Sequence, residues 1–314
     1  MATRRIRIHA FASTKGGVGK STLALLAARS LAGARRPVLV DLDLTGSSLA
    51  DGLDLEAPAL PLDDTGRFLP DATSLGWLSL QGVLLRRNQR SRHASAGAPF
   101  IQLPYANDAL LARQPIAIRE WLWRDPSDHL RVLPASSISA DVKRATRVLA
   151  EVDGLEWRDS LIATVRDLAA ADEEITDIVL DLPPGTWGFS HAALVAMVAL
   201  SNEVGPDQIE WSANPVFVTS PDRNALVPAI EYIATHDRYF KLGILPVVNR
   251  SLESPEFIRR AVLAKLSEPL RSLGFEERLI FFDDDRQWAT LFQGHVYPQP
   301  LTLRDHQASL LRLG

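Results

Sequence analysis

Residues 13–22, Ser-Thr-Lys-Gly-Gly-Val-Gly-Lys-Ser-Thr, are the stretch that most constrains the fold of this 314-residue chain. A short apolar run at residues 6–12 precedes it, and an alanine- and leucine-rich run at residues 23–31 follows it. The order strand, glycine-rich turn, helix is typical of a phosphate-binding loop, because glycines let successive backbone N–H groups surround an anion at the start of a helix. The sequence therefore predicts a loop that binds phosphate groups.

The side chains of this loop predict how the phosphates are held. Lys20 would reach the β- and γ-phosphates, and the hydroxyl of Ser21 would hold Mg²⁺. The general pattern has a glycine where this chain has Thr14, and the chain has an extra lysine, Lys15, before the glycine pair. The predicted nucleotide-binding residues of the loop are Gly16, Gly17, Val18, Gly19, Lys20, Ser21 and Thr22.

The pattern Lys-Gly-Gly-Val-Gly-Lys-Ser at residues 15–21 resembles the deviant phosphate-binding loop of the ParA/MinD family of ATPases, in which the position of Thr14 need not be glycine. The resemblance implies ATP and Mg²⁺ as cofactors and a slow ATP hydrolysis that a partner protein stimulates. It also implies that Lys15 reaches across a dimer interface to the phosphates held by the other subunit. The expected ATP-bound form is therefore a homodimer.

A second motif lies at residues 37–43, Pro-Val-Leu-Val-Asp-Leu-Asp. The continuous apolar run predicts a parallel strand covered on both faces, and ligands gather at the carboxyl ends of such strands. The resemblance places Asp43 in the first switch segment, where it helps to position or activate the attacking water and lies at the metal site. It makes Asp41 the more structural of the two aspartates.

A third motif lies at residues 178–186, Ile-Val-Leu-Asp-Leu-Pro-Pro-Gly-Thr. An apolar strand that ends in an aspartate is typical of a Walker B motif, so Asp181 is expected to hold Mg²⁺. The Pro-Pro-Gly turn that follows would bring the N–H of Gly185 close to the γ-phosphate. In the resembled family this turn is the second switch segment.

Asn249 ends a further apolar run at residues 242–249. The resemblance implies that its amide, which both donates and accepts, hydrogen-bonds the edge of adenine. The alternative is an asparagine that only ends a strand. Other strands are expected at residues 130–135, 216–221 and 279–282, and helices at residues 140–152, 157–171, 223–235, 256–273 and 304–313.

The fold expected from this order is one α/β domain over residues 1–314, with a doubly wound, mostly parallel sheet and helices on both faces. Residues 51–128 lose the alternation, so they are interpreted as an insertion with short helices over the nucleotide face. Trp121 and Trp123 are expected in its core. The basic cluster at residues 86–92 is either a solvated loop or a contact with an anionic partner. A polar insertion is expected at residues 201–214.

Composition excludes several functions. The chain has no cysteine, which excludes thiolate metal sites and iron–sulfur reductases or carriers. The net charge of −4 gives no overall basic surface for nucleic acid. The apolar run at residues 192–200 is too short to cross a bilayer, so the expected location is cytoplasmic.

Three functions remain open for the expected ATP-dependent switch. The favoured one is DNA partition or positioning of a cargo inside the cell, with non-specific DNA as a partner. A membrane-associated switch is not favoured, because the tail at residues 310–313 is too short and too weakly charged for an anchor. A regulator that binds a dedicated protein partner is the third. The candidate DNA contacts are residues 86–92 or Arg250, Arg259, Arg260, Lys265 and Arg271.

Overall fold

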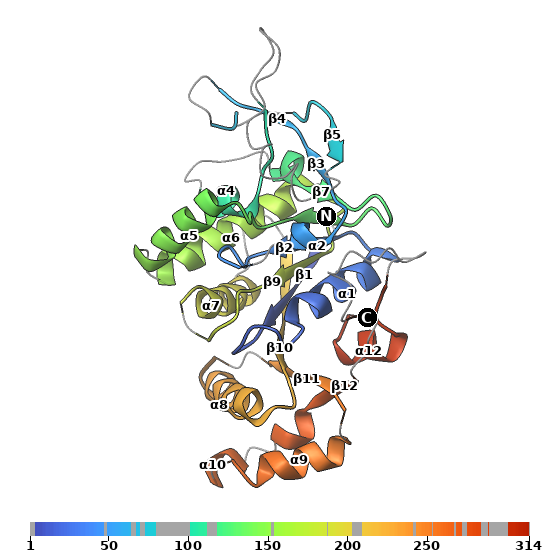
Figure 1. Ribbon diagram of the computed structural model, residues 1–314, viewed down its shortest axis with the longest axis vertical. Helices are drawn as coiled ribbons and strands as arrows, with labels where there is room; N and C mark the ends of the chain where they lie inside the picture. The colour runs from blue at the N-terminus through green and yellow to red at the C-terminus, as the bar shows by residue number, and fades with distance from the viewer. Residues whose placement is uncertain are drawn as a thin grey trace.

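A parallel sheet forms the centre of the protein in the computed structural model (Figure 1). The structure describes residues 4–46, 49–63, 67–69, 73–79, 101–111, 118–151, 154–186, 188–202, 209–240, 243–252, 254–266, 268–271, 275–283, 288 and 301–313. Within these residues, seven neighbouring strands pair in parallel, in the order β12 (Ile280–Asp283), β11 (Leu245–Ser251), β10 (Ile209–Thr219), β1 (Arg4–Ala12), β9 (Asp177–Asp181), β2 (Pro37–Asp41) and β8 (Arg131–Leu133).

Successive residues of the central strands point into two different cores. In β2, Val38 and Val40 join one core and Leu39 joins the other, because neighbouring side chains of a strand point to opposite faces. One core packs α1 (Lys20–Ala32) and α12 (Asp305–Leu310) against the sheet. The opposite core packs α5 (Ser139–Glu151), α6 (Gly154–Ala171), α7 (Phe189–Asn202), α8 (Arg223–Phe240) and α9 (Pro255–Leu263). The predicted doubly wound fold is confirmed.

The described part of residues 51–128 extends the sheet beyond β8. The strands β7 (Trp123–Arg124), β3 (Glu56–Pro58) and β5 (Trp77–Ser79) add to this edge in antiparallel pairs. The described strands of this segment therefore extend the edge of the sheet, and the expectation that the segment covers the nucleotide face stays a prediction. The edge of β8 would otherwise expose unpaired backbone groups. The remaining elements are α2 (Leu49–Gly52), α4 (Ala106–Leu111), the 3₁₀ helix η1 (Ile118–Trp121) and a two-stranded pair, β4 (Leu60–Pro61) with β6 (Ile101–Gln102).

The two tryptophans of this segment are buried, as expected. Trp121 packs against Phe68 with ring centroids 4.5 Å apart, and Trp123 donates its indole N–H to the carbonyl of Pro104 at 2.7 Å. The basic cluster at residues 86–92 lies outside the described residues.

Two other elements differ from the sequence prediction. The polar segment before residue 214 forms half of β10, because buried Ile209 and Trp211 alternate with exposed Glu210 and Ser212 and the strand pairs with β1. The single helix expected at residues 256–273 is divided into α9 and α10 (Glu268–Arg271), followed by the 3₁₀ helix η2 (Phe275–Arg278). A proline at position 269 disfavours one continuous helix, because it has no N–H to donate.

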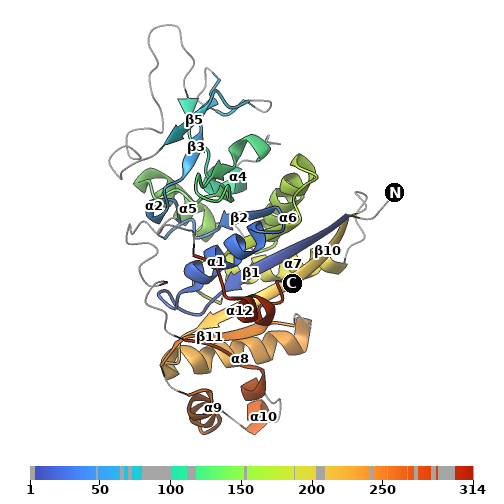
Figure 2. The same cartoon turned by 90° about the vertical axis from the view of Figure 1, so that its right-hand side faces the viewer.

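The C-terminal segment returns to the centre of the molecule (Figure 2). The N–H of Leu303 donates to Ser30 Oγ of α1 at 2.8 Å, and Asn214 Nδ2 of β10 donates to the carbonyl of Leu311 at 2.8 Å. Leu311 and Leu313 are buried in the same core as α1. Across the described ranges, the structure contains no helix with the length and apolarity needed to cross a membrane.

Candidate functional site

The glycine-rich loop joins β1 to α1 at the carboxyl edge of the sheet, as predicted. Gly17 and Gly19 have φ angles of +78° and +87°, a left-handed conformation that favours glycine. Gly19 immediately precedes the first turn of α1. A Cβ atom at position 19 would lie 2.3 Å from Nδ2 of Asn249, so the neighbouring strand also requires a glycine there. The loop therefore presents a helix N-terminus with a tightly supported backbone, which suits an anion.

Lys20 joins the loop to the predicted Walker B strand. Its side chain is only 6% exposed, and its ammonium contacts the carboxylate of Asp181. Ser21 Oγ lies 3.3 Å from Lys20 Nζ. The structure thus brings together the lysine, the hydroxyl and the carboxylate for which the sequence predicted phosphate and metal binding.

Asp41 faces Asp181 across the β2–β9 pair and is fully buried. Its carboxylate accepts from the backbone N–H of Asp43 at 3.0 Å and of Leu49 at 2.8 Å. Burial, with the nearby charge of Asp181, raises the pKa of Asp41 to about 8. Asp41 therefore holds both ends of the segment that begins at Asp43, which fits the structural role expected for it.

Asp43 is turned toward its own loop. Its carboxylate accepts from the backbone N–H groups of Thr45 and Gly46, and burial raises its pKa although the charge of Lys20 opposes this shift. A Cβ atom at position 46 would lie 2.4 Å from Asp43 Oδ2. Gly46 therefore permits the position of a side chain that the resemblance makes catalytic, although the sequence alone did not indicate Gly46.

Gly185 lies beside the glycine-rich loop in the predicted second switch segment, with a φ angle of +121°. Its N–H donates to the carbonyl of Ser13 at 2.8 Å. The contact of this N–H with a γ-phosphate remains a prediction, and it would require Gly185 to exchange the carbonyl for the phosphate.

Asn249 and Arg250 at the end of β11 support the loop from the other side. Asn249 is 2% exposed, and its Nδ2 donates to the carbonyl of Val18 at 3.0 Å. Its Oδ1 is buried with no hydrogen-bond partner within the described residues, so one acceptor is left for a donor such as an adenine amino group. Arg250 donates to the carbonyl of Gly17 at 3.1 Å. Sequence reasoning had placed Arg250 in a candidate DNA surface and had missed this contact.

Lys15 lies at the rim of the site and is separate from the buried cluster. Its ammonium is 3.6 Å from the carboxylate of Asp222, and both side chains are about half exposed, at 47% and 57%. Asp222 also accepts from the N–H of Asn224 at 3.3 Å, at the start of α8, as expected for a helix cap. Lys15 is thus the one lysine of the loop that solvent, or another subunit, can reach.

The donors around Lys20 suit Mg²⁺. They are the oxygen atoms of Ser21, Asp43 and Asp181, and Mg²⁺ prefers oxygen ligands and usually combines one or two carboxylates with phosphate and water. In the part of the chain that the structure describes, no group of three or more His, Cys, Asp or Glu side chains could hold a metal by itself. The donor set therefore fits a metal that a bound phosphate helps to hold.

Residues 9–179, which include the loop and two of the strand-end aspartates, match the family model of the CobQ/CobB/MinD/ParA nucleotide-binding domain. Because this match covers more than half of the chain, the protein belongs to that family of nucleotide-binding domains. Among curated proteins, none has a significantly similar sequence.

Solved structures show the same fold. The cell division ATPase MinD from Pyrococcus furiosus is 18% identical with a TM-score of 0.53, and the match covers 98% of this chain and 96% of MinD. MinD complexed with Mg-ADP from Pyrococcus horikoshii OT3 is 16% identical with a TM-score of 0.52, covering 98% and 94%. A structure from Borrelia burgdorferi B31, described as a plasmid partition protein bound to AMPPNP, is 13% identical with a TM-score of 0.52, covering 98% and 96%.

Proposed function

We propose that this protein is an ATPase that binds ATP with Mg²⁺, hydrolyses it to ADP, and forms a homodimer in its ATP-bound state. The observation that carries the proposal is the contact of Lys20 with Asp181 at the start of α1, beside Ser21. An ammonium, a hydroxyl and a strand-end carboxylate next to a glycine-rich loop are the parts that hold a triphosphate and its metal. The Mg-ADP and AMPPNP bound by two of the similar structures support this choice of ligand.

Each residue has a role that follows from its position. Lys20 would exchange part of its contact with Asp181 for the β- and γ-phosphates, and Ser21, Asp181 and Asp43 would hold Mg²⁺, which neutralises phosphate charge. Asp43 would orient the attacking water after leaving the N–H groups of its own loop. Positioning and charge neutralisation carry most of the rate in phosphoryl transfer.

Lys15 supports the proposed dimer. It is half exposed at the rim of the site, and its only described ion pair, with Asp222, is exposed and therefore weak. A lysine held this loosely can change partners when a second subunit brings its phosphates close. Hydrolysis would remove the γ-phosphate and release the two chains.

Partition or positioning of a cargo is the cellular role we favour for this switch. The similarity to a structure described as a plasmid partition protein supports it. Three of the five candidate DNA contacts already have partners within the chain. Arg250 donates to the carbonyl of Gly17, and Arg259 donates to the carbonyl of Leu279 and lies over the ring of Phe281. Arg271 donates to the carbonyl of Leu266 and forms an ion pair with Glu268.

Arg250, Arg260, Lys265 and Arg271 are exposed, but the internal contacts of Arg250 and Arg271 leave fewer of these cations available for a phosphate backbone. A regulator with a dedicated, stimulating protein partner is therefore the second candidate.

ATP hydrolysis by the purified chain tests the activity. We expect Mg²⁺-dependent release of phosphate that Lys20→Ala abolishes and Asp43→Ala reduces while leaving ATP binding in place. Hydrolysis at the wild-type rate in both variants would contradict the proposal.

Binding to a random DNA duplex, measured with ATP and with ADP over a salt series, tests the proposed cellular role. A steep, ATP-dependent salt slope supports partition, and absent binding favours the protein partner.

A further inference from the structure

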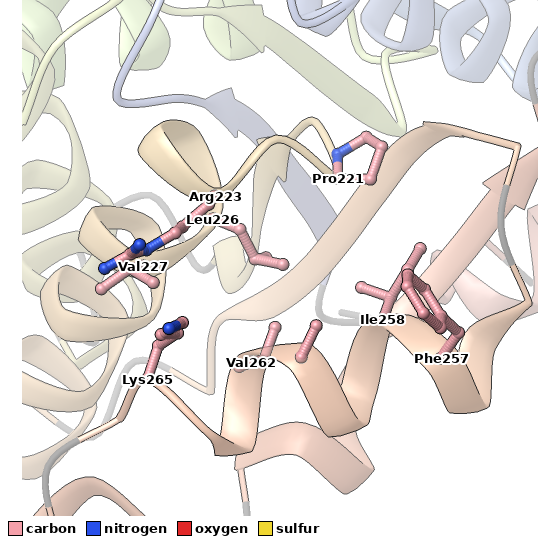
Figure 3. A pocket seen from close by; sticks show the side chains of 9 residues that line it. Pro221, Arg223, Leu226, Val227, Phe257, Ile258, Val262 and Lys265 are labelled. Carbon is pink, nitrogen blue, oxygen red and sulfur yellow. The ribbon is translucent and has the colours of Figure 1, made fainter.

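A groove lies between α8 and α9, and Pro221, which follows β10, lines it as well (Figure 3). Its cavity volume is about 160 Å³. Most of its lining is apolar, and the side chains come from two helices: Leu226 and Val227 from α8, and Phe257, Ile258, Ala261 and Val262 from α9.

The sequence of α9 explains why the groove remains open. Ile258 and Val262 are four residues apart, and they bury one face of the helix in the core. Phe257, Ala261 and Lys265 repeat at the same spacing on the neighbouring face and line the groove. Phe257 is 60% exposed, which is unusual for a large aromatic side chain within a helix. This second apolar stripe therefore lacks a covering element within the described residues.

The charged side chains that line the groove are all basic. Figure 3 shows the guanidinium of Arg223 and the ammonium of Lys265 at one end, with Phe257 and Pro221 toward the other. The lining contains no acidic residue. Among the residues that the structure describes, neither Arg223 nor Lys265 forms an ion pair, although their helices carry acidic side chains elsewhere. A ligand of this groove should therefore combine an anionic group with apolar side chains.

Each of the two helices that line the groove closely follows, in sequence, residues that contact the glycine-rich loop. Asp222, which pairs with Lys15, immediately precedes Arg223 at the start of α8. Asn249 and Arg250, which bond the loop carbonyls, lie a few residues before α9. A rearrangement of the loop would therefore act on both walls within a few residues of each.

We propose that this groove is the docking site for a short acidic, amphipathic segment of a partner protein. Two or three apolar side chains of the segment pack on Phe257, Ala261 and Leu226, and a carboxylate of the segment binds Arg223 and Lys265. Phe257 lies in α9 and Lys265 lies eight positions further on, in the turn that follows the helix, so the groove extends over about two helical turns, the length of a short helical partner. The surface favours protein over nucleic acid, because a phosphate backbone would leave Phe257 uncovered.

Selection from a displayed library of random 12-residue peptides against the full chain tests the docking site. Arg223→Glu/Lys265→Glu and Phe257→Ser are the test variants. Arg260→Glu is the matched control, since Arg260 is exposed on α9 but does not line the groove. We expect selected peptides that alternate acidic and apolar residues, and at least about tenfold weaker binding to both test variants with no change for the control. Replacing the acidic residues of a selected peptide by lysine should restore its binding to Arg223→Glu/Lys265→Glu.

Several outcomes would overturn the docking site. They are no enrichment of any peptide, enrichment of basic peptides, or binding that the groove variants do not weaken. Binding of a random DNA duplex that needs Arg223 and Lys265 but not Phe257 would assign the surface to nucleic acid and overturn it as well. The result is independent of the proposed ATPase, because a chain that does not hydrolyse ATP could still bind the peptides.

Discussion

The two ends of strand β9 each carry a buried aspartate, and the surroundings of the two carboxylates differ. Asp177, at the start of the strand, is surrounded by groups of the chain itself: His9 Nε2 at 3.0 Å, Arg35 Nη1 at 3.2 Å and the hydroxyl of Thr176 at 2.7 Å. Burial alone would raise the pKa of Asp177, but the hydrogen bonds from His9 and Thr176 and the charge of Arg35 outweigh it, and the pKa is lowered. The fold by itself satisfies this carboxylate.

Asp181, at the other end, lies in a cluster that the fold leaves incomplete. It contacts the ammonium of Lys20 and lies beside Asp41, so two buried carboxylates share one described cation. Burial raises the pKa of Asp41, and the nearby charge of Asp181 adds to this shift. A buried cluster with an excess of carboxylates is stabilised by a divalent cation, whereas the Asp177 cluster is already balanced. The comparison supports the interpretation that Asp177 contributes to stability and the proposal that Asp181 binds a ligand.

The largest effect is expected from Asp181→Asn. The amide keeps the shape of the side chain but removes the charge that would hold Mg²⁺, so hydrolysis should fall by about 10²- to 10³-fold. Steady-state phosphate release measures this, with urea denaturation as the check that the variant folds. Hydrolysis at the wild-type rate would contradict the proposal that Asp181 holds Mg²⁺.

Asp177→Ala is expected to lower the stability of the protein and to leave ATP hydrolysis unchanged. His9 and Arg35 would lose their buried partner, so the free energy of unfolding should fall by about 3 to 5 kcal/mol. Hydrolysis per folded molecule should not change. Urea denaturation measures the loss, and Asp159→Ala, whose side chain is 64% exposed, is the control. A stability equal to that of the control would mean that the two ends of β9 do not differ as described.

Asp41 should make stability depend on pH. Its carboxyl holds a proton more tightly in the folded protein, with a pKa of about 8, than in the unfolded chain. Its contribution is therefore complete at low pH and is lost as the pH rises to about 8. Without nucleotide, the free energy of unfolding should fall by roughly 1 kcal/mol per unit as the pH rises from the ordinary pKa of an aspartate, about 4, to about 8, and then level off. Asp41→Asn should be less stable and lack this slope; an equal slope in both would contradict the assignment.

The smallest effect is expected from Asp222→Asn, which removes the partner of Lys15. Exposed pairs of this kind contribute little, so the free energy of unfolding should change by less than about 0.5 kcal/mol. ATP hydrolysis should persist. Thermal melting of the wild type and the variant measures this. A loss of stability as large as that expected for Asp177→Ala would contradict the weak contribution assigned to the Lys15–Asp222 pair.

The sequence allowed prediction of the glycine-rich loop, Asp181 and the parallel sheet, because local spacing and apolar runs determine them. It did not indicate the pairing of His9 with Asp177 or the contact between Arg250 and Gly17, which join residues 168 and 233 positions apart. The antiparallel extension from residues 51–128 was also missed, since its strands are two or three residues long and carry no periodic pattern. Long-range pairing and very short strands are set by tertiary contacts.

The proposed ATP-dependent dimer is the central claim, and size-exclusion chromatography with light scattering tests it most directly. Wild type and Lys15→Ala are compared with ADP and with a non-hydrolysable ATP analogue, each with Mg²⁺. We predict that the analogue doubles the mass of the wild type, and that Lys15→Ala binds the analogue but keeps the mass of one chain. A wild type that remains a single chain with the analogue, or a variant that dimerises equally well, would contradict the account.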